Sequence, residues 1–413
     1  MRKAFALFVF IVAPLFVYAA EPEVVSTRCR ELDVPLDATH SSARLAGCGE
    51  ESSSDLLWHL DRIDQLDGGI LDGQYHRRHP GAGSVIYVMD TGVLASHAEF
   101  MRGDGVTRVI AGFDVTQAVN VGGSACRSAN KALRPCYDDM AELIGASHGT
   151  SVASLAAGSN IGVASDAFIV SVRVMNESAL ATTRTYLDGL NAIVRHSWSA
   201  DAPPFHTAVV NISGWVLERL IANPDPRPVP FAAVEQKMRD MIAGVDAQGR
   251  VDPNGKRFLF VAVAGNTGQC SSSGAVAVYP GILGTQIDGL ITVGGIDRAN
   301  HFWSGSCAGG AIDILAPAEN ILVASISAAN RYRGKGLGRD YSSGTSYAAP
   351  YVAGIAARIL EDEPALTPVE LEQRIKASPS FISDAGAPAG GRVAVLIESE
   401  PPAASPRRRA VAR

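Results

Sequence analysis

Four short motifs carry residue types that together can perform nucleophilic catalysis on a carbonyl group. Asp90 stands in Asp-Thr-Gly, His148 in His-Gly-Thr-Ser, Asn266 between two glycines of Gly-Asn-Thr-Gly, and Ser346 in Gly-Thr-Ser. A serine hydroxyl is a weak nucleophile until an imidazole removes its proton, and a carboxylate must hold that imidazole in the right tautomer. A further donor must stabilise the oxyanion that forms during attack. These four residues supply the four groups.

Each motif taken alone has a simpler explanation. An aspartate after a strand often caps a turn, and Gly-Thr-Ser can be an ordinary helix N-cap. Asp-Thr-Gly also occurs in aspartic proteases, but those enzymes need two such carboxylates and the chain has one Asp-Thr-Gly. An α/β-hydrolase esterase would have Gly-x-Ser-x-Gly at its nucleophile and the order Ser, Asp, His, and this chain has neither. The combination of motifs therefore favours nucleophilic catalysis by Ser346 on a carbonyl group.

Short apolar runs alternate along the chain with amphipathic segments. The runs read as strands buried on both faces of a parallel sheet, and the segments as helices with apolar residues three and four apart. Thr367 before Pro368 is a helix start signal. The alternation predicts an α/β fold, a three-layer doubly wound sandwich with a mainly parallel central sheet, in which sites form beyond the carboxyl ends of strands. The expected strands are residues 85–89, 169–174, 208–212, 258–264 and 290–293, and the expected helices are residues 183–195, 231–243, 346–360 and 368–377.

Over residues 55–377 the chain resembles the subtilisin family, and most closely its proteinase K-like branch. The order Asp90, His148, Ser346 carries the resemblance, with supporting matches at residues 60–65, 96–100, 313–317 and 344–354. The resemblance implies a subtilisin-like fold and a role for each residue. Asp90 would orient and stabilise the imidazolium, and His148 would act as general base and then general acid. Ser346 would attack the scissile carbonyl, while Asn266 would stabilise the oxyanion.

The resemblance also implies a substrate-binding edge and reveals two departures. The segment ending in Ser213 and Gly214 resembles the edge that pairs with substrate backbone as an added β-strand. The family usually has Ser-Leu-Gly there, whereas this chain has Ser213-Gly214-Trp215, so the first specificity pocket is not predicted. Ser151 and Ser154 stand where the family usually has His and Gly. Neither replaced residue transfers the proton, so we expect activity to survive.

The two ends of the chain differ from its middle. Residues 1–20 form a secretory signal peptide, with Arg2 and Lys3 before an apolar run and small residues at its end. That run is shorter than the roughly 20 residues of a spanning helix, and Pro14 interrupts it. We therefore expect an exported protein, extracellular or periplasmic, without stable membrane insertion after signal cleavage. Residues 21–54 form a short N-terminal pro-segment or arm, 55–380 the peptidase domain, and 381–413 a C-terminal extension with a disordered basic tail.

Six cysteines, at positions 29, 48, 126, 136, 270 and 307, are an even number in an exported chain and favour disulfides over metal ligation. The resemblance implies a Cys270–Cys307 bridge, and nearness in sequence suggests Cys29–Cys48 and Cys126–Cys136. No metal site is predicted and no cofactor is required for catalysis. Relatives often hold structural calcium, but no loop here is assigned to it.

Composition agrees with a globular enzyme. The chain has 413 residues, 47% hydrophobic and 19% charged, with a net charge of −6 and no basic block before its last residues, so no nucleic-acid partner is expected. The leading hypothesis is a monomeric, secreted serine endopeptidase that acts on proteins or peptides through an acyl-enzyme. The alternative is a catalytically silent subtilisin-fold binding protein. Sedolisin-like peptidases share the fold but use Glu where His148 stands, and His148 argues against them.

Overall fold

The computed structural model describes most of the chain between residues 57 and 396. The signal peptide, the basic tail and the cysteines at positions 29, 48, 126 and 136 lie outside the described residues, so these assignments stay predictions. The described residues are 23–26, 57–66, 71, 74–77, 79–116, 148–176, 179–217, 229–326, 331–333, 342–382, 384 and 387–396.

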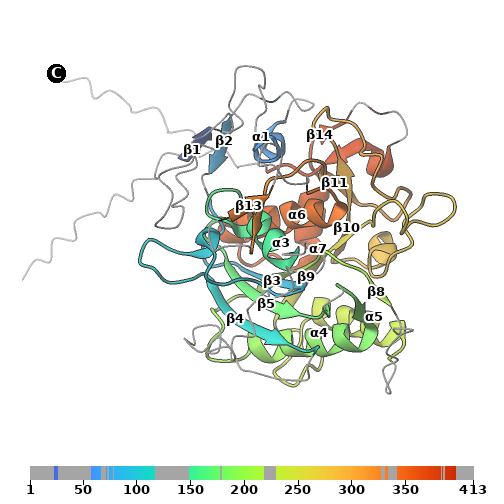
Figure 1. Cartoon of the computed structure of the whole chain (residues 1–413). Helices are drawn as coiled ribbons and strands as arrows, with labels where there is room; N and C mark the ends of the chain where they lie inside the picture. The colour runs from blue at the N-terminus through green and yellow to red at the C-terminus, as the bar shows by residue number, and fades with distance from the viewer. Residues whose placement is uncertain are drawn as a thin grey trace, which may run out of the picture.

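A nine-stranded sheet forms the centre of the molecule, in the order β14-β15-β11-β10-β9-β7-β3-β5-β4 (Figure 1). All its neighbouring pairs are parallel except β14 with β15. Its inner strands are buried along almost their whole length, as expected of a sheet covered on both faces. The strands are β3 (Val85–Asp90), β4 (Val109–Asp114), β5 (Phe168–Arg173), β7 (Thr207–Ile212), β9 (Arg257–Val263), β10 (Leu290–Ile296), β11 (Ile314–Pro317), β14 (Ser380–Phe381) and β15 (Arg392–Val393).

Helices cover the two faces of this sheet in separate layers. On one face lie α1 (Trp58–Asp64), α3 (His148–Ala157) and α6 (Thr345–Asp362), and on the other α4 (Thr183–Ser197) and α5 (Phe231–Ala243) (Figure 1). Two separate apolar clusters fill the spaces between the layers. The predicted three-layer α/β fold with a mainly parallel sheet is confirmed. None of the helices in the described part of the chain is long and apolar enough to cross a membrane.

The predicted elements are all present, with ends shifted by at most a few residues. The start of α7 (Pro368–Lys376) is as predicted, because the Thr367 hydroxyl accepts a hydrogen bond from the Glu370 amide and Glu370 caps Thr367 in return. The strands β4, β11, β14 and β15 of the main sheet were not predicted, and neither were the short strands outside it. The latter are β1 (Glu23–Ser26) paired with β2 (Gln74–Arg77), β6 (Ala181–Thr182) with β8 (Val216–Leu217), and β12 (Val323–Ser325) with β13 (Arg331–Arg333). Three short 3-10 helices complete the elements of the described residues: η1 (Ala98–Phe100), η4 (Gly281–Gln286) and η5 (Pro388–Gly391).

The sheet continues beyond the domain boundary expected at residue 380. Val393 of β15 pairs with Leu315 of β11, and the Ala394 amide donates to the Leu315 carbonyl over 2.8 Å. Farther on, the Leu396 amide donates to the Ile63 carbonyl at the end of α1. Residues 387–396 are therefore part of the same fold as the central strands.

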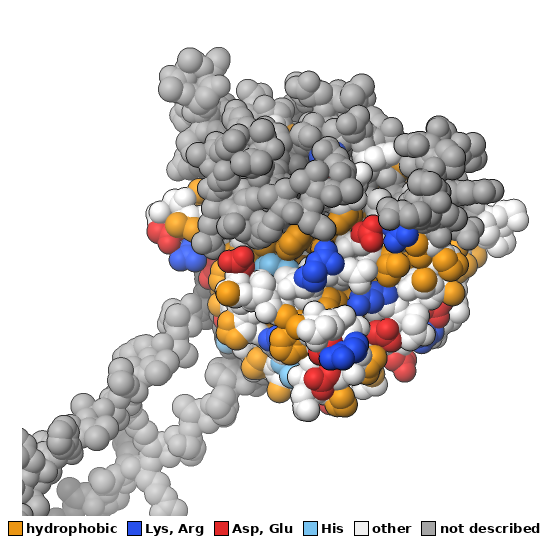
Figure 2. All heavy atoms as spheres, turned by 90° about the horizontal axis from the view of Figure 1, so that it is seen from below, with side chains coloured by type: hydrophobic (Ala, Val, Ile, Leu, Met, Phe, Trp, Pro, Cys, Tyr) orange, Lys and Arg blue, Asp and Glu red, His pale blue; other side chains and the backbone are white. Residues whose placement is uncertain are grey.

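On the face seen in Figure 2, acidic and basic side chains are interspersed rather than gathered by sign. Opposite charges four residues apart on α5 illustrate the pattern, since Arg239 donates to Glu235 over 2.8 Å. Such exposed pairs stabilise a helix by only a few tenths of a kcal/mol, so the fold depends on its apolar layers rather than on its surface charges.

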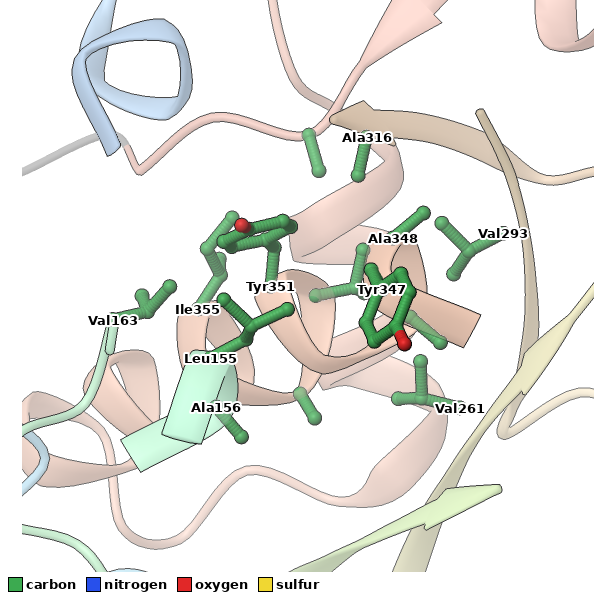
Figure 3. Packing of buried hydrophobic residues seen from close by; sticks show 14 of the residues in the cluster. Leu155, Ala156, Val163, Val261, Val293, Ala316, Tyr347, Ala348, Tyr351 and Ile355 are labelled. Carbon is green, nitrogen blue, oxygen red and sulfur yellow. The ribbon is translucent and has the colours of Figure 1, made fainter. Parts of the chain in front are cut away.

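Helices α3 and α6 cross at close range because Gly354 has no side chain. A Cβ at Gly354 would lie 2.5 Å from the Val163 Cβ and 2.7 Å from the Ala156 carbonyl oxygen. Around this contact Figure 3 shows the apolar side chains of α6 lying between Leu155 and Val163 on one side and Val261 and Val293 on the other. Interiors packed at this density cannot absorb an added methyl group without moving backbone.

We therefore expect Gly354→Ala to lower the free energy of unfolding by about 1–3 kcal/mol through overpacking. Gly310→Ala is the matched control, because a Cβ at this exposed glycine meets nothing within 4 Å and should change stability by less than about 0.5 kcal/mol. Urea unfolding followed by fluorescence measures both variants. Equal stability of the two variants would show that α3 and α6 are not packed as described.

Candidate active site

Asp90 and His148 form a hydrogen-bonded pair at the carboxyl end of the central strand β3. The His148 Nδ1 atom lies 2.8 Å from Asp90 Oδ1 and 2.9 Å from Oδ2. The Asp90 side chain is fully buried, whereas His148 keeps 23% of its side-chain surface exposed. Because an ionised carboxylate only accepts hydrogen bonds, the Nδ1 atom carries the proton, and Nε2 of the neutral ring is left as a base.

Hydrogen bonds to two threonine hydroxyls hold the first turn of α3 against the end of β3. The Gly149 amide donates to the Thr91 hydroxyl, and the Leu94 amide donates to the Thr150 hydroxyl, each over 2.9 Å. A Cβ at Gly149 would lie 2.1 Å from the Gly92 carbonyl oxygen, so only glycine allows this approach. The two threonines belong to the predicted motifs, but nothing in the sequence indicates what their hydroxyls bind.

Ser346 lies in the first turn of α6, beside the first turn of α3. The helix begins at Thr345, so the N–H groups of its first turn have no partner within the helix and its dipole favours negative charge there. The ring of the next residue, Tyr347, has its centroid 5.9 Å from that of His148. The residue next to the predicted nucleophile thus contacts the ring of the predicted base.

The side-chain amide of Asn266 is held in a fixed orientation by Thr345. Asn266 Oδ1 accepts hydrogen bonds from the Thr345 amide over 2.9 Å and from the Thr345 hydroxyl over 3.0 Å. Because Thr345 binds the oxygen, the Nδ2 atom of the same amide points away from Thr345. Thr345 is a site residue that the sequence reasoning did not assign.

A small space between Asn266 and Ser346 stays open because residue 344 is glycine. A Cβ at Gly344 would lie 3.0 Å from Ser346 Oγ, 3.4 Å from Asn266 Nδ2 and 3.7 Å from the Ser346 amide nitrogen. A hydroxyl oxygen and two nitrogen atoms that carry N–H groups therefore lie within 4 Å of one position. Such an arrangement can stabilise an oxyanion next to the atom that attacks.

A disulfide supports the loop that carries Asn266. Cys270 and Cys307 are bonded, with their Cα atoms 5.4 Å apart, as the resemblance implied. The Cys307 amide donates to the Gly265 carbonyl over 2.9 Å, and the Gln269 side chain accepts from the Asn266 amide. The loop is thus fixed on both sides of Asn266.

Ser213 and Gly214 follow the end of β7 and are buried. The Ser213 hydroxyl accepts a hydrogen bond from the Asn211 side chain over 2.8 Å. A Cβ at Gly214 would lie only 1.8 Å from the Cε atom of Met175, so the leucine usual in the family cannot fit here unless Met175 moves. Met175 was not predicted as part of this region, because it comes from a distant segment of the chain.

Tyr186 of α4 also faces this region, since its hydroxyl oxygen would lie 3.8 Å from a Cβ at Gly214. Burial and the nearby negative charge of Asp90 raise the pKa of Tyr186 well above its usual value. The phenol therefore stays neutral at any working pH. In the described part of the chain, no group of three or more His, Cys, Asp or Glu residues is placed to hold a metal ion.

Comparison with known proteins agrees with this geometry. The family model described as "Subtilase family" matches residues 81–390. The chain is 27% identical to a "Cuticle-degrading serine protease" of Arthrobotrys oligospora, over 79% of this chain and 64% of the relative. It is 31% identical to "Subtilisin-like protease 3" of Pseudogymnoascus destructans, over 77% of this chain and 63% of the relative.

A Thermus protein described as "Extracellular serine proteinase" is 28% identical over 81% of this chain and 64% of its own length. A crystal structure described as a "cold adapted subtilisin-like serine proteinase" matches with a TM-score of 0.59 and 26% identity, over 84% of this chain and 100% of that one. The fold is that of a subtilisin-like serine peptidase, and the chain belongs to the subtilase family. It spans about 64% of the length of the first of these curated relatives.

The Cys270–Cys307 bridge closes a loop across a sequence separation of 37 residues. We expect the double variant Cys270→Ser/Cys307→Ser to lose about 2–4 kcal/mol of stability, because its unfolded state is less constrained. Thermal unfolding of the variant and of wild type under non-reducing conditions measures the difference. An unchanged melting temperature would mean that the bridge adds nothing to the stability of the loop beside Asn266.

Proposed function

We propose that this protein is a secreted serine endopeptidase that hydrolyses peptide bonds through an acyl-enzyme. One set of observations carries the proposal: the Ser346 hydroxyl and two nitrogen donors lie within 4 Å of one position, and the next residue, Tyr347, contacts a histidine whose Nδ1 is bound to a buried aspartate. This is the set of groups that attack on a carbonyl requires. The membership in the subtilase family supports the same reaction.

In the proposed mechanism, His148 removes the proton of Ser346 as the hydroxyl attacks the scissile carbonyl. The carbonyl oxygen becomes an oxyanion in the space beside Gly344, where Asn266 Nδ2 and the Ser346 amide donate to it. Asp90 stabilises the imidazolium that forms, and His148 then gives its proton to the leaving amine. A water molecule, deprotonated by His148, then attacks the acyl-enzyme in the same way and releases the second product.

The substrate would bind along the segment that follows β7. Ser213 and Gly214 lie there, and an extended peptide can add to such an edge as a further strand. Main-chain hydrogen bonds of this kind suit protein and peptide substrates of varied sequence. The side chains of Met175 and Trp215 would then shape the pockets next to the scissile bond.

Export is proposed on the N-terminal sequence, in which basic residues precede a short apolar run that ends in small residues. The extracellular relative from Thermus supports this assignment. The disulfide between Cys270 and Cys307 is also typical of proteins in oxidising compartments.

A fluorophosphonate probe tests the nucleophile, because it reacts covalently only with an activated serine. We expect the wild-type protein to be labelled and Ser346→Ala not to be labelled. Ser343→Ala is the control, since Ser343 lies three residues earlier and its hydroxyl accepts from the Asn320 amide. Absence of labelling in folded wild-type protein would contradict the proposal and favour a binding protein with this fold.

A second test concerns the oxyanion. Asn266→Ala should lower kcat roughly 100- to 1,000-fold with little change in KM, because the lost hydrogen bond forms in the transition state. Asn254→Ala, on an exposed turn, should leave both constants at the wild-type values. Steady-state hydrolysis of a chromogenic peptide measures all three proteins.

Gly344→Ala provides a second form of this test, because its methyl group would lie 3.0 Å from Ser346 Oγ and 3.4 Å from Asn266 Nδ2, at a φ of +158° that side chains rarely adopt. We expect a fall in kcat of the same order as for Asn266→Ala. If both variants keep the wild-type kcat, then Asn266 and Gly344 do not border the reacting oxygen.

A further inference from the structure

One segment, residues 318–325, contacts the loop before Ser346 at one end and helix α3 at the other. We call it the bridging segment. At its first end the Gly344 amide donates to the Ala318 carbonyl over 2.8 Å, and the Ile321 amide donates to the Ser342 carbonyl over 2.9 Å. These bonds fix the residues that lead directly into Ser346.

At its other end the bridging segment binds α3 through two serine side chains. The Ser151 hydroxyl donates to the Ala324 carbonyl over 2.8 Å, and the Ala324 amide donates to the Ser154 hydroxyl oxygen over 3.1 Å. The Ser154 hydroxyl in turn donates to the Ser151 carbonyl over 2.7 Å. Both serines are fully buried. Three hydrogen bonds therefore close a ring between helix and strand.

The ring satisfies backbone groups that would otherwise be buried without partners. Ala324 lies opposite Tyr332 in the antiparallel pair β12–β13, and in such a pair alternate residues direct their N–H and C=O groups away from the partner strand. Those of Ala324 point to α3, where the two serines meet them. A buried backbone group without a partner is destabilising, so the ring holds the segment on the helix.

We propose that Ser151 and Ser154 are positioning residues that set the distance between His148 and Ser346. This inference rests on the proposed peptidase function. Ser151 lies one helical turn after His148, on the same side of α3. The bridging segment then continues this attachment to Gly344, two residues before Ser346.

This attachment is separate from the one that holds the Asp90–His148 pair. Thr91 and Thr150 join α3 to the end of β3, whereas the two serines join it to the bridging segment. Loss of the serine hydroxyls would therefore leave the imidazole bound to Asp90 and α3 packed against α6, but would release α3 from the segment that holds the loop before Ser346. A displacement of about 1 Å between reacting groups can slow reaction up to roughly 100-fold.

The test compares Ser151→Ala and Ser154→Ala with a control that loses a similar bond elsewhere. Ser84→Ala is that control, because the buried Ser84 hydroxyl donates to the Ala357 carbonyl over 2.7 Å, far along α6 from Ser346. We expect all three variants to melt at lower temperature. Only Ser151→Ala and Ser154→Ala should lose kcat, by roughly 10- to 100-fold, with KM unchanged.

Two further readouts separate positioning from a merely structural role. The midpoint of the rise of kcat/KM with pH should match wild type in Ser151→Ala, because the contact between His148 and Asp90 persists. Ser151→Thr, which keeps a hydroxyl, should recover much of the lost kcat. If Ser151→Ala does not fold, Ser154→Ala is judged by the same measurements.

Wild-type kcat in both serine variants, alongside a melting temperature as low as that of Ser84→Ala, would overturn the inference. A shifted pH midpoint in Ser151→Ala would also overturn it, since the serine would then act through Asp90. These results differ from failure of the proposed function, in which the wild-type protein itself neither cleaves peptide nor reacts with fluorophosphonate.

Discussion

The burial of Asp90 is the constraint from which the rest of the site follows. A carboxylate with no exposed surface has lost its water, and its charge is tolerable only if donors replace that water. The Thr91 amide, 2.7 Å from Oδ1, supplies one donor and the His148 ring supplies the other. The imidazole must therefore stand at the end of β3, and α3 must begin there. The position of the base is thus a consequence of where the chain buries a charge.

Three glycines allow the close contacts on which the geometry of the site depends. Gly149 lets α3 reach the end of β3, Gly354 lets α6 lie against α3, and Gly344 leaves room between the hydroxyl and the amide. Each glycine lies on an element with its own packing partners, so the distances between reacting groups are fixed before any substrate arrives. Preorganisation of this kind is what makes hydrogen-bond donors effective on a transition state, because they need not reorient as charge develops.

The sequence predicted most of the framework and named four candidate reacting residues, but not the groups that hold them. Continuous apolar runs identified the inner strands, and Thr367 with Pro368 identified the start of α7, because these signals are local. By contrast, β12 is three residues long and too short to show a hydrophobic pattern. Its main contacts with α3 are made by Ser151 and Ser154, some 170 residues away. The two serines were noted only as departures from a family pattern. Met175 was missed for the same reason, since nothing local indicates that it fills the space beside Gly214.

The pairing of β15 with β11 has a consequence for anyone who shortens this protein. Ending the chain near residue 380, where the sequence suggests a boundary, would remove Val393 and leave Leu315 without its neighbour. An uncovered hydrophobic strand at the rim of a sheet offers its free amides and carbonyls to a second molecule. Shortened versions would then self-associate through β11, and their insolubility could be mistaken for a defect in catalysis.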